Sequence, residues 1–338
     1  MRILTIGGTQ FIGRHFVQAA LDGGHEVTVF HRGRTGAGLF PAAAHLTGDR
    51  DQGLGALATG TWDATVDFCA YLPGQVSALA AALGGRGGRH MLISSVSAYR
   101  TPAPAGYGED WRLAEPPGPE VREVTNETYG GLKVACERAA LDAYGAVATT
   151  IIRPTYVIGP HDHTYRLTWW VERLARGGRV LAPGDPADPI QVIDARDLAS
   201  WMVALLDRSV TGAFHAASPE PPFGFGPLLE AIAAEVAPAG TQLTWVGSEF
   251  LRADGLDDSA LPLWPGASLD DASLGAASAA AARATGLAPR PLAQSVADIH
   301  AHEAASPTPV PAGTGIDAAR EAGLLAGWAA RDTVAGGR

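Results

Sequence analysis

The chain has 338 residues, of which 46% are hydrophobic and 18% are charged, and its formal net charge is −10. This composition supports a folded core and excludes wholesale disorder, and the acidic excess argues against a general role in binding RNA or DNA. Two cysteines exclude a disulfide framework and a four-cysteine zinc site. No apolar run reaches the ~18 residues that a membrane span needs, and the chain opens directly on an apparent strand, so we expect a cytoplasmic protein without a membrane partner.

In the first half, short apolar runs alternate with helical patterns. The predicted strands are 3–6, 26–30, 63–68, 90–94 and 149–152, and the predicted helices are 11–21, 76–83 and 129–143. Strands that alternate with helices imply parallel βαβ units. The sequence therefore predicts an α/β fold with a Rossmann-type, doubly wound parallel sheet.

After residue 160 this alternation is lost. The predicted elements there are a strand at 190–193, helices at 169–176, 195–206, 227–236, 276–285 and 316–330, and a Pro/Gly-rich linker at 304–315. We therefore expect residues 1–160, with 190–215 returning to them, to form the Rossmann-type domain. Residues 161–189 and 216–338 are predicted to form a smaller C-terminal substrate-binding lobe and tail.

A glycine-rich turn follows the first predicted strand and opens a helix. Its sequence is Gly7-Gly8-Thr9-Gln10-Phe11-Ile12-Gly13. Glycines at such a turn let the backbone approach a pyrophosphate, which the helix N-terminus favours. A tight structural turn without a ligand is the alternative. The candidate cofactor-binding residues of this turn are Gly7, Thr9, Gln10, Phe11, Ile12 and Gly13.

A basic segment follows the second predicted strand. An NAD site usually places Asp or Glu there for the ribose 2′-hydroxyl, whereas this chain has His31, Arg32 and Arg34. Arginine binds a 2′-phosphate well, so NADP is the favoured cofactor and NAD stays open. A solvated basic loop is the alternative.

Two further segments carry candidate catalytic groups. Tyr129 and Lys133 are four residues apart on a predicted helix, where they share one face, so the ammonium of Lys133 would lower the pKa of the Tyr129 hydroxyl. Ser95 follows a predicted strand, at the edge where doubly wound folds bind ligands. Taken singly, the pair and the serine are also typical of ordinary structural positions.

In their order along the chain, these segments resemble the extended branch of the short-chain dehydrogenase/reductase superfamily, the NAD-dependent epimerase/dehydratase-like proteins. Residues 152–160 are similar to the Arg-Pro…Tyr-Gly-Pro segment of that branch, and residues 192–199 to its Asp-Leu-Ala segment. The resemblance covers about residues 1–210. It implies that Ser95, Tyr129 and Lys133 form a catalytic triad, that Lys133 also holds the nicotinamide ribose, that Asp49 contacts the adenine and that Pro154 lies near the nicotinamide.

Two positions depart from the family pattern. Gln10 stands where the family usually has the middle glycine of its turn, as in an atypical subgroup that includes chloroplast stem-loop binding proteins, which act on RNA. Ile190 stands where nucleotide-sugar enzymes of this branch carry an arginine for the diphosphate. A buried isoleucine cannot balance a diphosphate, so a nucleotide-sugar substrate is not expected.

The sequence therefore predicts an NADP(H)-dependent oxidoreductase that acts on a carbonyl or alcohol of a small metabolite. Two alternatives stay open: an epimerase or dehydratase whose bound NAD(P) is oxidised and reduced within each turnover, and a non-redox RNA-binding or regulatory member of the same fold. No metal site is predicted, because the His161-Asp162-His163 segment has no third ligand in the sequence. A homodimer stays open. Tyr156, Tyr165, Trp169 and Trp170 are candidates for an aromatic wall beside the substrate, and ordinary core positions are the alternative.

Overall fold

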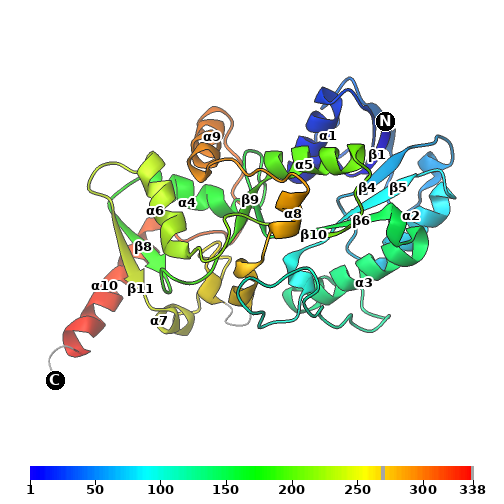
Figure 1. Cartoon of the computed structure of the whole chain (residues 1–338). Helices are drawn as coiled ribbons and strands as arrows, with labels where there is room; N and C mark the ends of the chain where they lie inside the picture. Colours follow the sequence, from blue (N-terminus) through cyan, green and yellow to red (C-terminus); the bar gives the residue numbers. More distant parts are fainter. Residues whose placement is uncertain (268–270, 336–338) are drawn as a thin grey trace. The chain divides into compact units, whose positions relative to one another are not determined.

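The structure, a computed structural model, describes residues 1–267 and 271–335 (Figure 1). The chain divides into two compact units. The first unit comprises residues 1–157, 192–220 and 277–289, and the second comprises residues 158–191, 221–276 and the described part of 290–338. Within the described ranges, none of the helices has both the length and the apolar character that crossing a membrane requires.

A seven-stranded parallel sheet forms the centre of the first unit. Its strands, in spatial order, are β10 (Gly212–Ala216), β6 (Thr149–Pro154), β5 (Arg89–Ile93), β4 (Ala64–Asp67), β1 (Arg2–Ile6), β2 (Glu26–His31) and β3 (Ala44–Thr47). The chain runs outward from β1 through β2 to β3, and then returns to β4 on the other side of β1. This reversal is the switch point at which doubly wound sheets bind ligands. The predicted fold class is confirmed.

Helices cover both faces of this sheet (Figure 1). α1 (Phe11–Asp22) and α5 (Ala195–Asp207) pack together on one face, and α2 (Pro73–Leu83) and α3 (Asn126–Tyr144) pack together on the other. The ends of α3 follow from the sequence, because Thr125 caps its first turn through the Thr128 N–H and Gly145 follows its last residue. α3 thus begins three residues before Tyr129.

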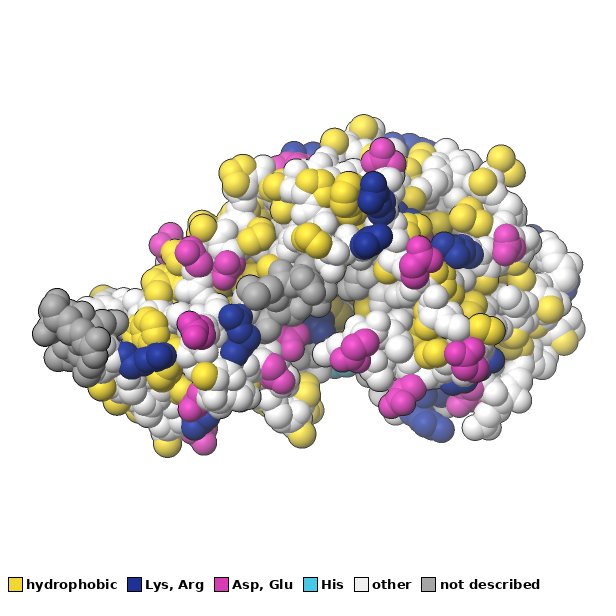
Figure 2. Space-filling model, turned by 90° about the horizontal axis from the view of Figure 1, so that it is seen from below, with side chains coloured by type: hydrophobic (Ala, Val, Ile, Leu, Met, Phe, Trp, Pro, Cys, Tyr) yellow, Lys and Arg dark blue, Asp and Glu magenta, His cyan; other side chains and the backbone are white. Residues whose placement is uncertain are grey.

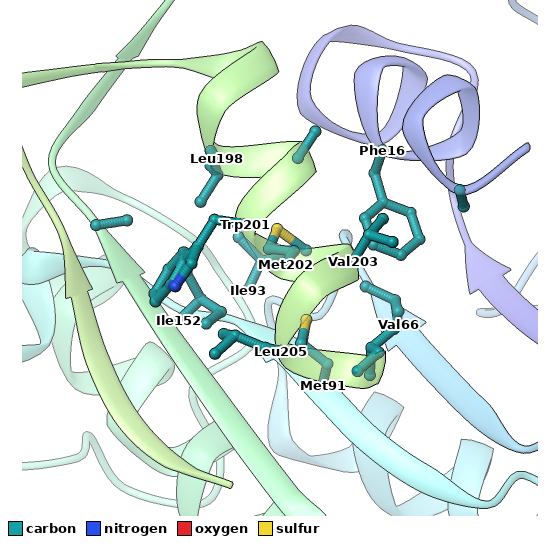
Figure 3. Close-up of a cluster of buried hydrophobic side chains, with 14 of the residues drawn as sticks. Phe16, Val66, Met91, Ile93, Ile152, Leu198, Trp201, Met202, Val203 and Leu205 are labelled. Atoms are coloured by element: carbon teal, nitrogen blue, oxygen red, sulfur yellow. The ribbon is translucent and has the colours of Figure 1, made fainter. Parts of the chain in front are cut away.

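A large buried cluster fills the space between the sheet and the α1–α5 layer (Figure 3). Phe16 reaches into it from α1, and α5 contributes Leu198, Trp201, Met202 and Leu205. The strands contribute Val66, Met91, Ile93 and Ile152 from below. Strands covered on both faces bury nearly all of their side chains, which explains why the sequence shows them as mostly apolar runs.

The second unit is built mainly of helices. Its elements are α4 (Arg166–Ala175), β8 (Arg179–Pro183), α6 (Phe225–Val236), β11 (Gln242–Val246), α7 (Ser248–Ala253), α9 (Leu292–Ala305) and α10 (Ala318–Ala335). β8 and β11 pair in parallel, and α4, α6 and α9 pack on one another. A buried ion pair between Arg173 of α4 and Glu321 of α10, at 2.8 Å, fixes the last helix to this unit.

Several features of the second half differ from the sequence prediction. The sequence did not indicate the strands β8, β10 and β11 or the helices α7 and α9, and it placed residues 277–289 in the C-terminal lobe. In the structure these residues belong to the first unit, where α8 (Ala280–Ala284) contacts β10, and Ala282 and the following Leu287 are part of the buried cluster between the sheet and the α1–α5 layer. Two further short strands are β7 (Tyr156–Ile158) and β9 (Val192–Asp194), which pair with each other. Residues 268–270 and 336–338 of the predicted lobe lie outside the described residues.

Candidate active site

The glycine turn of residues 7–13 joins β1 to α1. Gly8 has a φ of +126°, and a Cβ atom on Gly13 would lie 2.7 Å from the Gly8 Cα, so both positions require glycine. Gln10 precedes α1 in an extended conformation, with an exposed side chain that makes no capping hydrogen bond. The turn therefore presents a helix N-terminus without a side-chain cap, which is a setting suited to a phosphate group.

The loop that carries Arg32 and Arg34 lies against this turn. The Thr9 and Thr35 hydroxyls are 3.4 Å apart, and a Cβ atom on Gly36 would lie 3.1 Å from the Thr9 carbonyl oxygen. Both arginines are exposed, and among the described residues no carboxylate pairs with either of them. The structure thus places the loop that carries these two exposed arginines beside the turn predicted to hold the pyrophosphate.

A pair of histidines supports the base of that loop. The Gly33 N–H donates to His31 Nδ1 at 3.1 Å, and His31 Nε2 lies 3.0 Å from His45 Nδ1. His45 Nε2 lies 3.2 Å from the Phe40 carbonyl oxygen, which can only accept. These roles require both rings to be neutral with the proton on Nε2, and burial, followed by the neighbouring His45, lowers the pKa of His31. His31 therefore uses both ring nitrogens inside the protein, and sequence reasoning missed His45.

Asp49 and its neighbours line the same edge of the sheet. The Gly48 N–H donates to the His31 carbonyl oxygen at 3.0 Å, which places Asp49 directly beyond the end of β3 and beside β2. The next residue, Arg50, forms a buried bidentate ion pair with Asp67 at 2.7 and 3.0 Å. Sequence analysis missed this pair, although an aspartate at the carboxyl end of the apolar strand β4 was a visible signal.

The predicted catalytic serine and helix α3 approach each other closely. Ser95 follows β5 and caps a short 3₁₀ turn, because its Oγ accepts the Ser97 N–H at 3.0 Å and lies 3.1 Å from the Ser97 hydroxyl. A Cβ atom on Gly130 would lie 2.1 Å from the Ser97 carbonyl oxygen. Glycine next to Tyr129 is therefore what allows the helix to lie against the Ser95 segment.

Lys133 is buried between these two elements, with 3% of its surface exposed. Its ammonium donates to the carbonyl oxygens of Ile93 and Ala70 at 3.0 and 2.9 Å. The centroid of the Tyr129 ring lies 5.7 Å from Lys133 Nζ. The structure therefore brings Tyr129 and Lys133 together, as the spacing predicts, and ties the ammonium to the strand that ends two residues before Ser95.

A buried polar network lies behind this site, and it was not predicted. Arg153 forms a bidentate ion pair with Glu137 at 2.6 and 2.9 Å, and Glu137 also accepts the Ser94 hydroxyl at 2.5 Å. Arg153 further donates to the Tyr99 hydroxyl at 2.5 Å, which lies 2.7 Å from His215 Nε2. The network fixes the residues directly preceding Ser95 and Pro154. The sequence did carry one sign of this network, because Glu137 stands four residues after Lys133 on the same face of the helix.

The aromatic residues predicted as a substrate wall are mostly core residues of the second unit. Trp170 is fully buried, packs edge-on against Phe225 and donates from its indole N–H to the Pro262 carbonyl oxygen. Trp169 is 7% exposed and packs edge-on against Trp170. Ile190 is fully buried. A buried apolar side chain offers no charge to balance a diphosphate.

These features define a Rossmann-type α/β protein in which Ser95, Tyr129 and Lys133 lie on neighbouring elements, the segment after β5 and the helix α3. Residues 63–216 match the sequence model of the NAD dependent epimerase/dehydratase family. Over these residues, the match confirms the epimerase/dehydratase-like family predicted from the sequence. The matched segment contains Ser95, Tyr129, Lys133 and Pro154, whereas the glycine turn precedes it.

Individual relatives are distant. The chain is 25% identical over 221 residues to the chloroplast stem-loop binding protein of 41 kDa b from Arabidopsis thaliana, and the match spans 61% of this chain and 55% of that relative. The fold is similar to that of UDP-glucuronic acid 4-epimerase from Bacillus cereus in complex with NAD, with a TM-score of 0.62, 15% identity, and 93% and 100% of the two chains covered. A human epimerase family protein with NADPH aligns with a TM-score of 0.60, 18% identity and coverages of 88% and 99%.

Proposed function

We propose that the chain is an NADP(H)-dependent oxidoreductase that acts on a carbonyl or alcohol group of a small metabolite. The observation that carries this proposal is the junction of α3 with the end of β5. There, Lys133 Nζ lies 3.0 Å from the Ile93 carbonyl oxygen and 5.7 Å from the Tyr129 ring, and Ser95 follows two residues after Ile93. The family match of this segment supports an enzyme that uses a nicotinamide cofactor.

The residues of the chain have distinct roles in this proposal. A bound nicotinamide dinucleotide would supply hydride chemistry. The Tyr129 hydroxyl gives a proton to the substrate oxygen in reduction and takes one in oxidation. The Ser95 hydroxyl hydrogen-bonds the same oxygen, and the charge of Lys133 stabilises the Tyr129 phenolate.

The exposed arginines support NADP over NAD. Arg32→Ala removes a charge-assisted contact to a 2′-phosphate, which corresponds to ~1.5–3 kcal/mol, or roughly ten- to hundredfold in affinity. We expect weaker binding of NADPH and little change for NADH, measured by calorimetry or nicotinamide fluorescence. Arg138→Ala, at another exposed arginine, is the matched control. Equal losses for both cofactors would show that Arg32 does not contact the 2′-phosphate. If the wild type binds neither NAD(H) nor NADP(H) at sub-millimolar levels, the proposed function is refuted.

The proton-transfer role is tested with Tyr129→Phe. This substitution keeps the ring beside Lys133 and removes the acid–base group, so we expect turnover to fall ~10²-fold or more while cofactor binding persists. The assay is NADPH oxidation against a panel of aldehydes and ketones. Tyr144→Phe is the matched control, because Tyr144 ends the same helix and its buried hydroxyl has no hydrogen-bond partner among the described residues. Equal activity of Tyr129→Phe and the wild type would remove Tyr129 from the chemistry.

An epimerase or dehydratase is the second candidate, favoured by the family of the matched segment. The same three side chains serve it, because a transient oxidation also needs a proton acceptor at the substrate oxygen. The two reactions differ in stoichiometry, since an epimerase consumes no net cofactor. NADPH oxidised in a one-to-one ratio with product supports the reductase and excludes the epimerase. The fully buried Ile190 argues against the nucleotide-sugar form of the second candidate.

Binding of a structured RNA is the third candidate function, favoured by the similarity to a chloroplast stem-loop binding protein. The net charge of −10 argues against it, and on the face drawn in Figure 2 the described basic side chains are interspersed with acidic ones. Contacts to phosphates would give an affinity that falls steeply as salt rises. A titration with a labelled RNA hairpin at low and high salt decides, and absence of binding at low salt excludes this candidate.

A further inference from the structure

Tyr71 lies beside the predicted catalytic lysine, although it belongs to none of the motifs of the sequence. It follows β4 in the chain, and Lys133 Nζ lies 4.8 Å from the centroid of its ring, closer than from the ring of Tyr129. The Tyr71 N–H donates to Gln75 Oε1 at 2.9 Å, which fixes the backbone at this position. Its side chain stays 43% exposed. Tyr71 is thus an accessible aromatic ring held over the ammonium of the site.

The surroundings of Lys133 explain why such a ring matters. Burial lowers the pKa of Lys133, because a buried ammonium loses its hydration. The two carbonyl oxygens of Ala70 and Ile93 replace only part of that hydration. The titratable groups that face the ammonium are Tyr71, Tyr129, Cys69, Cys136 and Asp67. Asp67 is already engaged by Arg50 at 2.7 Å, so that ion pair balances the charge of this carboxylate.

We propose that Tyr71 is a further positioning residue of the candidate active site, whose ring holds the Lys133 ammonium in its charged form beside Tyr129. The face of an aromatic ring attracts a cation within about 6 Å of its centroid, and the attraction is stronger where water is excluded. This inference rests on the proposed role of Lys133 in tuning Tyr129. The ring, rather than the hydroxyl, carries the effect, because it is the centroid that lies within this distance.

Lys133 can be observed on its own, because it is the only lysine of the chain, in which 24 of the 25 basic residues are arginines. Biosynthetic labelling with lysine carrying ¹³C at Cε gives one resonance, and its chemical shift reports the protonation of Nζ without assignment. The measurement needs neither substrate nor cofactor. It therefore tests Tyr71 independently of the proposed reaction.

The test is a graded series at position 71. Tyr71→Phe keeps the ring and should leave the titration midpoint of Lys133 unchanged. Tyr71→Leu keeps an apolar cover of similar size without a π face and should lower the midpoint by about half a pH unit. Tyr71→Trp offers a stronger π face and should raise the midpoint if the larger ring is accommodated, which circular dichroism and thermal unfolding check. Once a substrate is known, the alkaline limb of kcat/KM should move with the midpoint across the series.

Three results would overturn the proposal: an unchanged midpoint in folded Tyr71→Leu, a raised midpoint in that variant, or a shift in Tyr71→Phe as large as in Tyr71→Leu. The last result would assign the effect to the hydroxyl. NADPH binding by the wild type is measured in parallel. If the wild type binds no dinucleotide while the series behaves as expected, the proposed function fails and the placement of Tyr71 stands.

Discussion

The buried side chain of His90 makes the free energy of unfolding depend on pH, and one substitution can separate this contribution from the others. It lies fully buried on β5, and neither of its ring nitrogens has a hydrogen-bond partner among the described residues. Its ring stacks on that of Tyr144 with the centroids 4.2 Å apart and the planes 1° from parallel. Burial lowers the pKa of His90 from 6.5 to about 4. The folded protein therefore holds His90 neutral, whereas the unfolded chain protonates it near pH 6.5.

The sign and size of the effect follow from these two values. Between pH 6.5 and pH 4 the unfolded state binds more protons than the folded state, so stability falls as the pH falls through this window. With one pKa unit equal to ~1.4 kcal/mol, His90 removes about 2 kcal/mol of unfolding free energy between pH 7 and pH 5, and the loss levels off below about pH 4.

The experiment compares the wild type with His90→Phe in urea unfolding at pH 7, 6 and 5 at constant ionic strength. Phenylalanine keeps the stack on Tyr144 and loses no hydrogen bond, so its unfolding free energy should fall about 2 kcal/mol less than that of the wild type over this range. His163→Gln, at an exposed histidine, is the matched control and should follow the wild type. Parallel losses in the wild type and His90→Phe would show that the folded state does not exclude the proton from His90.

Two further substitutions test the packing that builds the site. Gly130→Ala would place a Cβ atom 2.1 Å from the Ser97 carbonyl oxygen, so we expect a loss of ~1–3 kcal/mol in urea unfolding together with reduced turnover, whereas Gly74→Ala, at a helical glycine with nothing within 4 Å, should be neutral or stabilising. Glu137→Gln leaves the buried Arg153 without its charged partner, and we expect a loss of ~3–5 kcal/mol in the same assay; a loss below 1 kcal/mol would mean that Arg153 finds another partner.

The sequence was most informative where one local pattern determines structure. Strands buried on both faces appear as apolar runs, and the glycine turn and the Tyr129–Lys133 spacing are readable without partners. The predicted helices at 11–21, 76–83 and 195–206 correspond to α1, α2 and α5, with ends within three residues. These local signals were sufficient to predict a parallel sheet, five of its seven strands and the helices that connect them.

Features that depend on distant partners could not be predicted in this way. The His215–Tyr99–Arg153–Glu137 network joins four separate elements, and a charged residue on a helix or a histidine in a short strand is also typical of a surface. β10 was missed because its five residues show no clear alternation. Residues 277–289 were misplaced because alanine-rich helices carry little information about which face they bury, and the chain returns to the first unit after more than fifty residues in the second.

The surroundings of Lys133 help to explain the unequal use of arginine and lysine in this chain. The chain uses arginine at 24 of its 25 basic positions, so its single lysine stands out. At the ion pairs of Arg50 and Arg153, a planar guanidinium binds a carboxylate through two hydrogen bonds, which an ammonium cannot reproduce. At Lys133 the requirement is the opposite, because a compact charge must reach two carbonyl oxygens at 2.9 and 3.0 Å while two tyrosine rings lie close by. A guanidinium spreads its donors over a plane, whereas an ammonium directs several donors from a single atom. The geometry of the site therefore accounts for the one position at which this chain uses lysine.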